Sequence, residues 1–519
     1  MKNQIMPTIC GFFVALTKMK HAPRVRTVAF LALLFELTLL STPSAWAVPS
    51  YSRRYGVQCS SCHTMWGALN GAGNAFKLSG YRWINGKPAK PEIEDIEIAK
   101  GVTIPSTLPL SFITGVGIDS RKEDRQASNG TSSTSKGSSI SLEDASIFMT
   151  SPLGEHLSAF VEFPMYETKA WEFTPTGKAE ANSTGTGRHV QFKAESPTFE
   201  VAKFFWNNLL GDSVPHDSVN LLFGITHPPL AYSSGKVRLS VNQYLIYERR
   251  ALDLLSPNKV SDVIGGSDEY LFRLGEPQGL AEVYGMLTFG KPEADVTKRD
   301  TFWAEYHLGL SNGSNGKADN NTSKDIYGRW VMRYYNQSLG LFTYRSPDTY
   351  DDGLRTNASI AGNTLGMGIM SGSQDANKTS RNGVDFTLSL LPVGVPVWLD
   401  NQLMFNNESN PTGFGQEFKW HGGFHQINWQ PSKDYIAYAR YDHIKGDAFN
   451  DTTISRNGVT GITKSTPSEW DYVVGLQHLL NQNTKLVAEY RHHSFEDTAS
   501  PVASRLKDDG FTLRAMFGF

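Results

Sequence analysis

The chain has 519 residues, a formal net charge of −2 and three cysteines. The balanced charge gives no basic footprint, so nucleic acid is excluded as a partner, and three cysteines are too few for a fold stapled by disulfides. Aromatic residues make up 12% of the chain and 47 residues are glycine. This composition favours a porous β-protein with a polar interior over a long soluble enzyme.

Residues 1–47 predict an N-terminal signal peptide. Basic side chains precede an apolar run, Val28–Leu40, and Ser44–Ala47 supplies the small residues of a cleavage site. The apolar run is too short to span a bilayer as a stable helix. We expect export and cleavage after Ala47, with Met19 as the alternative start of the chain.

The run Cys59-Ser60-Ser61-Cys62-His63 has the spacing of a c-type haem attachment site. Two thiols bond to the haem vinyl groups, and the adjacent histidine becomes an axial ligand of the iron. We therefore predict that Cys59 and Cys62 hold one covalent haem c and that His63 binds its iron. The alternative is a redox Cys-x-x-Cys pair that happens to precede a histidine.

The predicted haem segment, residues 48–104, does not complete its own site. A segment of this size can bury little of a haem, and no histidine lies between Thr64 and Phe148. The sixth iron ligand is then Lys77, a water, or a His or Met from the rest of the chain. His493 is one such residue, because alternation along its predicted strand places it on an inner face.

Residues 105–519 show short alternating segments that predict an all-β transmembrane barrel. The last segment is the clearest, because its odd positions from Phe511 to Phe519 are apolar and its even positions include Arg514. Other predicted strands are Leu108–Ile118, Ile140–Thr150, His156–Tyr166, Ser218–Ile225, Thr301–Leu310, Asp325–Tyr335, Tyr435–His443, Trp470–Leu479 and Lys485–His493.

The connections between these strands alternate between short and long, as in outer-membrane barrels. Asp119–Ser139 and Ile444–Ser468 are long, whereas Ser151–Glu155 and Gln430–Asp434 are short. Both chain ends are then periplasmic and the strand number is even. An average of about 25 residues per strand gives about 16 antiparallel strands, with 14 or 18 as alternatives. The haem segment is expected to plug the lumen from the periplasmic side; the alternative is a segment hanging in the periplasm.

Together, the haem segment and the barrel resemble the fused outer-membrane cytochrome–porin family, the monohaem iron-oxidising outer-membrane cytochromes. The residues that carry the resemblance are Val48-Pro49-Ser50-Tyr51, Cys59-x-x-Cys62-His63-Thr64 and Phe76-Lys77-Leu78-x-Gly80-Tyr81. The chain departs from the family pattern at Gly67, where proline is frequent, and at Ala72-Gly73-Asn74, where a Phe-Gly-Arg-like run is usual.

The resemblance implies a location in the outer membrane of a Gram-negative bacterium. It also implies electron uptake from extracellular Fe(II), or another small donor, and delivery to a periplasmic cytochrome or other carrier. The protein would be an enzyme only in the sense of oxidising a metal ion. Two alternatives remain: a diffusion porin for a small solute with a structural or gating haem plug, and outward electron transfer. A monomer and a porin-like trimer are both compatible with the sequence.

Overall fold

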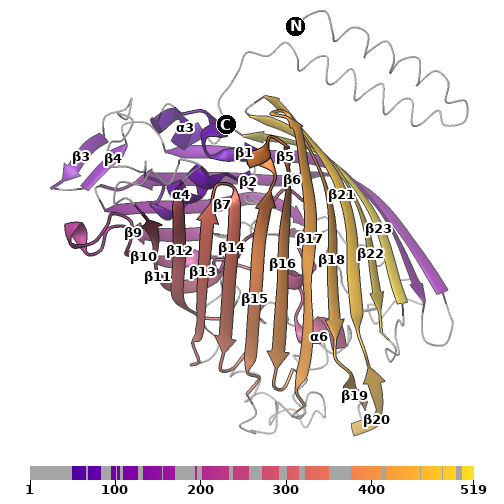
Figure 1. Ribbon diagram of the computed structural model, residues 1–519. Coiled ribbons are helices and arrows are strands. Elements are labelled where there is room, and N and C mark those ends of the chain that lie inside the picture. Colours follow the sequence, from indigo (N-terminus) through magenta and orange to yellow (C-terminus); the bar gives the residue numbers. More distant parts are fainter. Residues whose placement is uncertain are drawn as a thin grey trace, which may run out of the picture. The chain divides into compact units, whose positions relative to one another are not determined.

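Most of the described chain forms a closed antiparallel β-barrel (Figure 1). The computed structural model describes residues 49–55, 57–65, 68–82, 95–100, 102–105, 109–126, 132–154, 156–169, 193–195, 201–232, 238–255, 272–290, 301–314, 319, 322–349, 376–411, 416–455, 458–481, 483–497 and 505–518. The predicted signal peptide and Phe519 lie outside the described residues. None of the described helices is long and apolar enough to cross a membrane.

The barrel wall consists of strands that follow one another in sequence and in space. They are β5 (Leu110–Gln126), β6 (Ser132–Pro152), β7 (Leu157–Lys169), β8 (Lys193–Glu195), β9 (Val201–Trp206), β10 (Asn220–Thr226), β11 (Gln278–Phe289), β12 (Phe302–Ser311), β13 (Asp325–Tyr334), β14 (Gln337–Ser346), β15 (Thr379–Ser389), β16 (Val397–Glu408), β17 (Phe418–Ser432), β18 (Tyr435–Gly446), β21 (Ser468–Asn481), β22 (Thr484–Glu496) and β23 (Arg505–Gly518).

The remaining helices and strands precede the barrel or lie in the connections between its strands. They are α3 (Pro49–Tyr55), η1 (Cys59–Ser61), β1 (His63–Met65), β2 (Ala68–Leu69), α4 (Gly71–Leu78), β3 (Asp95–Ala99), β4 (Val102–Pro105), η2 (Gly211–Ser213), α5 (Leu245–Glu248), α6 (Ala251–Leu255), η3 (Leu391–Val393), β19 (Phe449–Ser455) and β20 (Gly458–Ser465).

The described strands occupy sixteen positions around the barrel. The short strand β8 and the strand β9 both pair with β7, through Glu167↔Glu195 and Glu162↔Val201, so together they fill one position. The last strand closes on the first through the β23–β5 pairing. The sixteen antiparallel strands and the even number predicted from the sequence are therefore confirmed.

The two ends of the barrel differ in the length of their connections. At the end that we call the short-turn end, only four residues separate β6 from β7, and two residues each separate β17 from β18 and β21 from β22. The first barrel strand begins and the last one ends at this end (Figure 1), as the sequence predicts. At the opposite, long-loop end, the predicted loop Asp119–Ser139 is wrong in its bounds, because β5 continues to Gln126 and β6 begins at Ser132.

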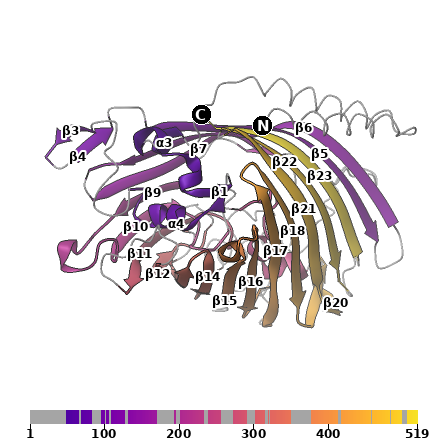
Figure 2. The ribbon, with the colours of Figure 1, turned by 45° about the horizontal axis from the view of Figure 1, so that its top comes forward.

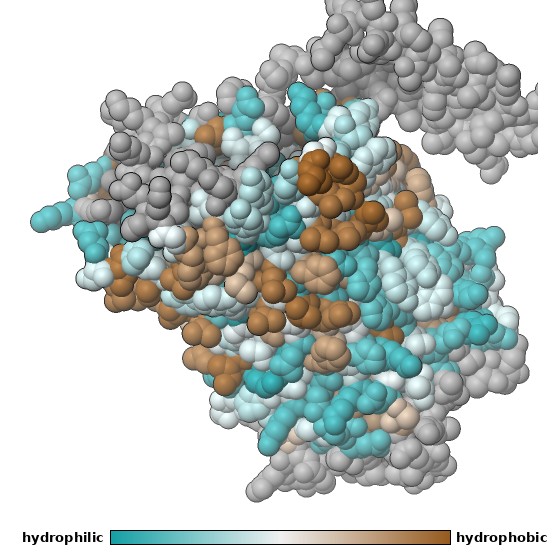
Figure 3. All heavy atoms as spheres, viewed as in Figure 1, coloured by the Kyte–Doolittle hydropathy of each residue, from teal (hydrophilic) through white to brown (hydrophobic). Residues whose placement is uncertain are grey.

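The wall is polar inside and apolar outside. Outward-facing side chains such as Leu308, Phe405 and Val474 are more than half exposed, whereas Arg329, Asp385 and other charged residues are buried within the barrel. Figure 3 shows apolar side chains gathered in a band across the wall, with hydrophilic ones toward the long-loop end. This reverses the usual arrangement of a soluble protein and is the pattern of a barrel whose outer face contacts lipid.

Candidate functional site

The segment before the barrel fills the lumen at the short-turn end, and we call its described residues 49–82 the plug. The Ser50 backbone N–H donates to Ser111 Oγ at 3.1 Å, and Ser50 Oγ lies 2.8 Å from Thr150 Oγ1. The Arg53 guanidinium donates to the Leu110 carbonyl at 2.6 Å. These contacts fix α3 to the beginning of β5 and the end of β6, and Figure 2 shows α3, α4 and β1 within the ring of strands.

Aromatic stacking holds the other side of the plug to the wall. Tyr81 stacks on Tyr51 within the plug and on Phe160 of β7, with ring centroids 5.1 and 5.3 Å apart, and meets the edge of Phe205 on β9. Gly80, with φ of +65°, forms the turn that places the Tyr81 ring against the wall. A Cβ at position 80 would lie 2.1 Å from Asn207 Oδ1. Each such aromatic pair contributes roughly 0.5–1.5 kcal/mol beyond its buried area.

The haem motif forms a tight turn braced by the helix that follows it. The Cys62 N–H donates to the Cys59 carbonyl at 3.1 Å. The Asn70 amide donates to the Ser61 carbonyl at 3.2 Å, while its Oδ1 accepts the Gly73 N–H at 2.9 Å and so caps the N-terminus of α4. A Cβ at Gly73 would lie 2.0 Å from the Cys62 carbonyl oxygen, so glycine is what allows α4 to pack directly on the motif.

The two motif cysteines do not form a disulfide with each other. Cys59 and Cys62 are of intermediate exposure, and burial, with a smaller effect of Cys59, raises the pKa of the Cys62 thiol to about 11. Cys62 is therefore a neutral thiol at neutral pH. Because the attacking thiol of a redox Cys-x-x-Cys pair is its first cysteine, the pKa of Cys62 does not decide between haem attachment and the redox alternative.

His63 presents an imidazole suited to bind a metal. Burial lowers its pKa to about 4, so the ring is neutral at neutral pH, and its buried Nδ1 has no hydrogen-bond partner within the described chain. A neutral imidazole with an unsatisfied buried nitrogen fits the chemistry of an axial haem ligand. No group of three or more His, Cys, Asp or Glu side chains among the described residues is placed to hold a metal ion by itself.

The barrel wall forms part of this site. Gln430 of β17 donates to the Thr64 carbonyl at 2.9 Å, and Ala68 packs against a cluster that includes Ile436 of β18. The ammonium group of Lys485 on β22 adds a smaller effect to that of burial in lowering the pKa of His63. The hairpin β1–β2 thus faces the wall formed by β17 to β22, as expected for a segment that cannot enclose its own site.

The structure does not bring His493 to this site, and its prediction as a distal ligand is corrected. His493 is inward-facing and fully buried, but its Nδ1 lies 2.6 Å from Asp471 Oδ1 and its Nε2 3.3 Å from Glu469 Oε1. It also lies eight residues beyond Lys485 along β22, which is roughly 27 Å at 3.3–3.4 Å per residue. Its role is structural, near the long-loop end.

Lys77 stays a prediction as a distal ligand. It lies on α4, where burial lowers its pKa and the carboxylates of Glu305 and Glu282, on β12 and β11, act against that effect. The charge that acts on the pKa of His63 is Lys485 of β22, which lies across the sixteen-position ring from β11 and β12. Lys77 and His63 are therefore influenced by charges on different parts of the wall.

A second segment fills the lumen from the long-loop end, and sequence reasoning missed it. We call residues 227–277 the inner loop, of which 233–237 and 256–271 lie outside the described residues. It connects β10 to β11 and carries α5 and α6. Tyr244, Leu245 and Tyr247 are fully buried, in one cluster with Phe424 of the wall and Leu78 of the plug. The apolar run from residue 244 to 247, between two predicted strands, was the signal available in the sequence.

Charged groups anchor the inner loop. Arg249 donates to both carboxylate oxygens of Glu469, with its Nε 2.9 and 2.8 Å away. Glu489 accepts hydrogen bonds from the backbone N–H groups of Val241 and Asn242 at 3.0 and 3.2 Å. The loop therefore crosses the lumen and meets strands of the opposite wall.

Comparison with known proteins supports no family assignment. The sequence matches no protein-family profile, and no curated protein matches it. Among solved structures, the chain is similar to the anion-selective porin from Comamonas acidovorans, at 13% identity and a TM-score of 0.44, covering 79% of this chain and 99% of that one. It is also similar to the outer-membrane channel DcaP of Acinetobacter baumannii, at 10% identity and a TM-score of 0.41, covering 82% and 99% of the two chains. Likeness this remote transfers no function, and the barrel described above rests on its own strand pairing.

Proposed function

We propose that this chain is an outer-membrane cytochrome–porin fusion that takes electrons from extracellular Fe(II) and passes them to a periplasmic carrier through one covalently bound haem c. The observation that carries the proposal is the braced turn of Cys59 to His63 in the plug. There two thiols at the spacing of a haem attachment site stand next to a neutral imidazole whose buried Nδ1 has no hydrogen-bond partner among the described residues.

Each residue of the turn has a separate role in this proposal. Cys59 and Cys62 tether the haem through thioether bonds, and His63 sets its axial field. Bound haem supplies one-electron exchange at its iron. Asn70 and Gly73 position the turn, because they bring α4 against the Cys62 carbonyl. His493 does not reach the site, so the sixth ligand would be Lys77, a water, or another His or Met of the chain.

The position of the plug gives the electron an entry and an exit. An apolar outer face and a polar lumen support a place in the outer membrane, with the short-turn end periplasmic. Ser60 and Ser61 are exposed, so the motif turn lies within reach of a soluble carrier. Each turnover oxidises one Fe(II) to Fe(III), and its electron leaves to the carrier. In this proposal Fe(II) arrives from the long-loop end of the barrel, which faces the outside of the cell.

Anaerobic titration of the haem-loaded protein with Fe(II) tests this proposal. We expect covalent haem in a denaturing gel and stoichiometric reduction by Fe(II), and we expect Cys59→Ala to lose the covalent haem. Ser61→Ala is the matched control, since it preserves the spacing and the backbone carbonyl that Asn70 contacts. Absence of covalent haem would refute the attachment site, and haem that Fe(II) leaves oxidised would refute iron as the donor.

A diffusion porin is the second candidate, and the closed barrel with its polar inner face favours it. Against it, the plug and the inner loop share one buried cluster in the lumen. Conductance across a planar bilayer separates the two functions. Steady ionic conductance of the haem-loaded protein, without reduction by Fe(II), would favour the porin.

A further inference from the structure

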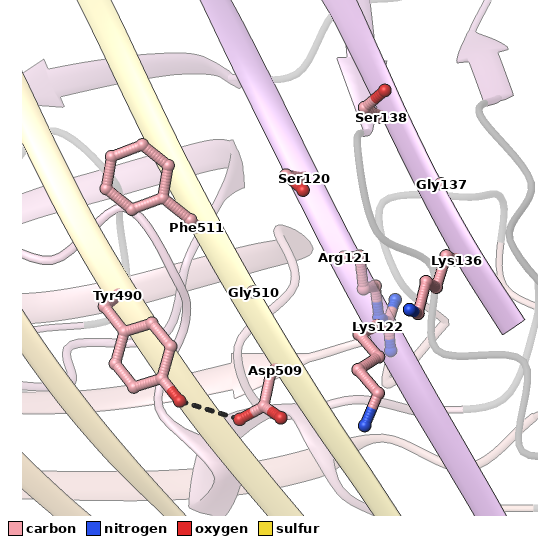
Figure 4. A pocket seen from close by; sticks show the side chains of 10 residues that line it. All are labelled: Ser120, Arg121, Lys122, Lys136, Gly137, Ser138, Tyr490, Asp509, Gly510 and Phe511. Carbon is pink, nitrogen blue, oxygen red and sulfur yellow. Dashed lines mark hydrogen bonds between the residues drawn. The ribbon is translucent and has the colours of Figure 1, made fainter. Parts of the chain in front are cut away.

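A groove of about 500 Å³ lies on the outside of the barrel, away from the plug and the inner loop. It crosses β22, β23, β5 and β6 toward the long-loop end (Figure 4). Its floor and sides include Ser120, Lys122, Lys136, Ser138, Tyr490 and Phe511. Tyr490 belongs to β22 and Phe511 to β23, whereas the two serines and two lysines belong to the parts of β5 and β6 that continue beyond the predicted strands.

The strand register arranges the groove as a ladder of changing polarity. On β5 and β6, Ile118 pairs with Ile140, Ser120 with Ser138, and Lys122 with Lys136. Successive pairs are two residues apart, or roughly 7 Å. Ile140 is 81% exposed and Ile118 is 45% exposed, so the ladder begins in the apolar band, passes two hydroxyls and ends at two ammonium groups.

The lysine pair is unfavourable by itself. Like charges directly opposite each other on neighbouring strands destabilise a sheet. Asp124 contacts Lys122 and also faces Lys136, but it shares its carboxylate with Thr134, at 2.6 Å. An anion between the ammonium groups would relieve their repulsion.

Around the groove, lysine side chains outnumber carboxylates. Asp509 lines the groove and accepts from Tyr490 Oη at 2.7 Å, with His492 Nδ1 also 2.7 Å from the same oxygen. Lys507 stands opposite Asp124 in the β23–β5 register. Three lysines therefore stand around two carboxylates, of which Asp124 is the ion-pair partner of Lys122 and Asp509 contacts Tyr490 and His492.

We infer that this groove binds a phosphorylated membrane lipid, with its phosphate between Lys122 and Lys136, its polar linker at Ser120 and Ser138, and an acyl chain along Ile118 and Phe511. The inference rests on the membrane placement in the proposed function, which puts the groove at the outer-leaflet interface. The order of apolar, hydroxyl and ammonium groups matches the order of groups in such a lipid, and a charge-assisted contact to phosphate is stronger than a neutral one.

Native mass spectrometry of the haem-loaded protein in detergent tests the inference with three probes: a lipid with a phosphorylated headgroup, the same lipid without phosphate, and inorganic phosphate. We expect the phosphorylated lipid to bind, and the double variant Lys122→Gln/Lys136→Gln to bind it roughly tenfold more weakly. Lys122→Arg/Lys136→Arg should retain binding. Lys419→Gln, which removes an exposed lysine on β17, is the control.

Three results would overturn the inference. They are undiminished binding by the double variant, equal binding of the phosphate-free lipid, and equal binding of inorganic phosphate, which would mean a site for a free anion. The haem spectrum of the double variant should match that of the unmodified chain, because the groove lies outside the lumen. A missing haem signal in the unmodified chain would refute the proposed function. The lipid measurement would still test the groove, because it does not depend on the haem.

Discussion

The plug and the inner loop both fill the lumen, yet different chemistry holds each of them. The plug is attached by aromatic stacking and by hydrogen bonds between uncharged groups or to backbone carbonyls. The inner loop is attached by buried carboxylates that accept from arginine and from backbone N–H groups. The position of the plug therefore depends on close packing of uncharged groups. The position of the inner loop depends on buried charge pairs, and removing one partner leaves the other charge buried without compensation.

The largest effect is expected from breaking the anchor of the inner loop. Glu469→Gln removes the charge that compensates Arg249, whose side chain is 9% exposed. Loss of one partner of a buried ion pair costs about 3–5 kcal/mol, which a lowered thermal unfolding midpoint in detergent would report.

Glu496→Gln is the matched control for this variant. Glu496 pairs with Arg505 at 2.7 Å, but both side chains are about half exposed, and such pairs contribute about 0–1 kcal/mol. Equal midpoints for the two variants would contradict the view that buried charge holds the inner loop.

The next effect concerns the fit of α4 against the haem motif. Gly73→Ala places a Cβ 2.0 Å from the Cys62 carbonyl oxygen, so α4 must move away from the turn, at about 1–3 kcal/mol for an overpacked contact. We expect less covalent haem per chain, measured from the absorbance of the denatured protein.

Gly71→Ala tests whether the helix or the contact matters. A Cβ at Gly71 meets no atom within 4 Å, and alanine favours the helix over glycine. Haem content that falls equally in both glycine variants would refute the close approach at Gly73.

A comparable effect is expected where the plug stacks on the wall. Tyr81→Leu keeps apolar bulk but removes the stacking on Tyr51 and Phe160, which is worth roughly 1–3 kcal/mol for two pairs. Limited proteolysis should cut the plug faster while the barrel stays intact. Phe386→Leu, a change on the lipid-facing side of β15, should leave the cleavage rate unchanged; a similar rate in Tyr81→Leu and the unmodified chain would exclude stacking as the anchor.

The smallest effect is expected at the cap of α4. Asn70→Ala loses the N-cap and the contact to the Ser61 carbonyl, at about 1 kcal/mol. Asn70→Ser keeps a capping oxygen but loses the amide donor, so the two variants separate the roles. We expect thermal midpoints in the order unmodified chain, Asn70→Ser, Asn70→Ala, and an equal drop for both variants would show that the amide donor matters more than the cap.

Sequence patterns could predict the parts of this fold that repeat. Alternation with a period of two marks lipid-facing and lumen-facing residues locally, so the segments from Asp325 to Tyr335 and from Lys485 to His493 lie close to the observed strands β13 and β22. The prediction ended the first strand at Ile118, whereas β5 continues to Gln126. Beyond Ile118 the outward-facing residues are serine and lysine instead of apolar residues, and such a polar stretch is typical of a loop.

The sequence by itself determined an even-numbered antiparallel barrel whose first strand begins and whose last strand ends at the same side, and a five-residue run with the spacing of a haem site. Both are encoded by short-range order along the chain. Only the tertiary structure decided where the plug and the inner loop dock, which wall Lys77 and His63 each face, and that His493 serves Asp471 and Glu469. The docking contacts join residues hundreds of positions apart, such as Gln430 and Thr64. The contacts of His493 span only 22 and 24 positions, but they depend on the pairing of β21 with β22, which no local pattern records.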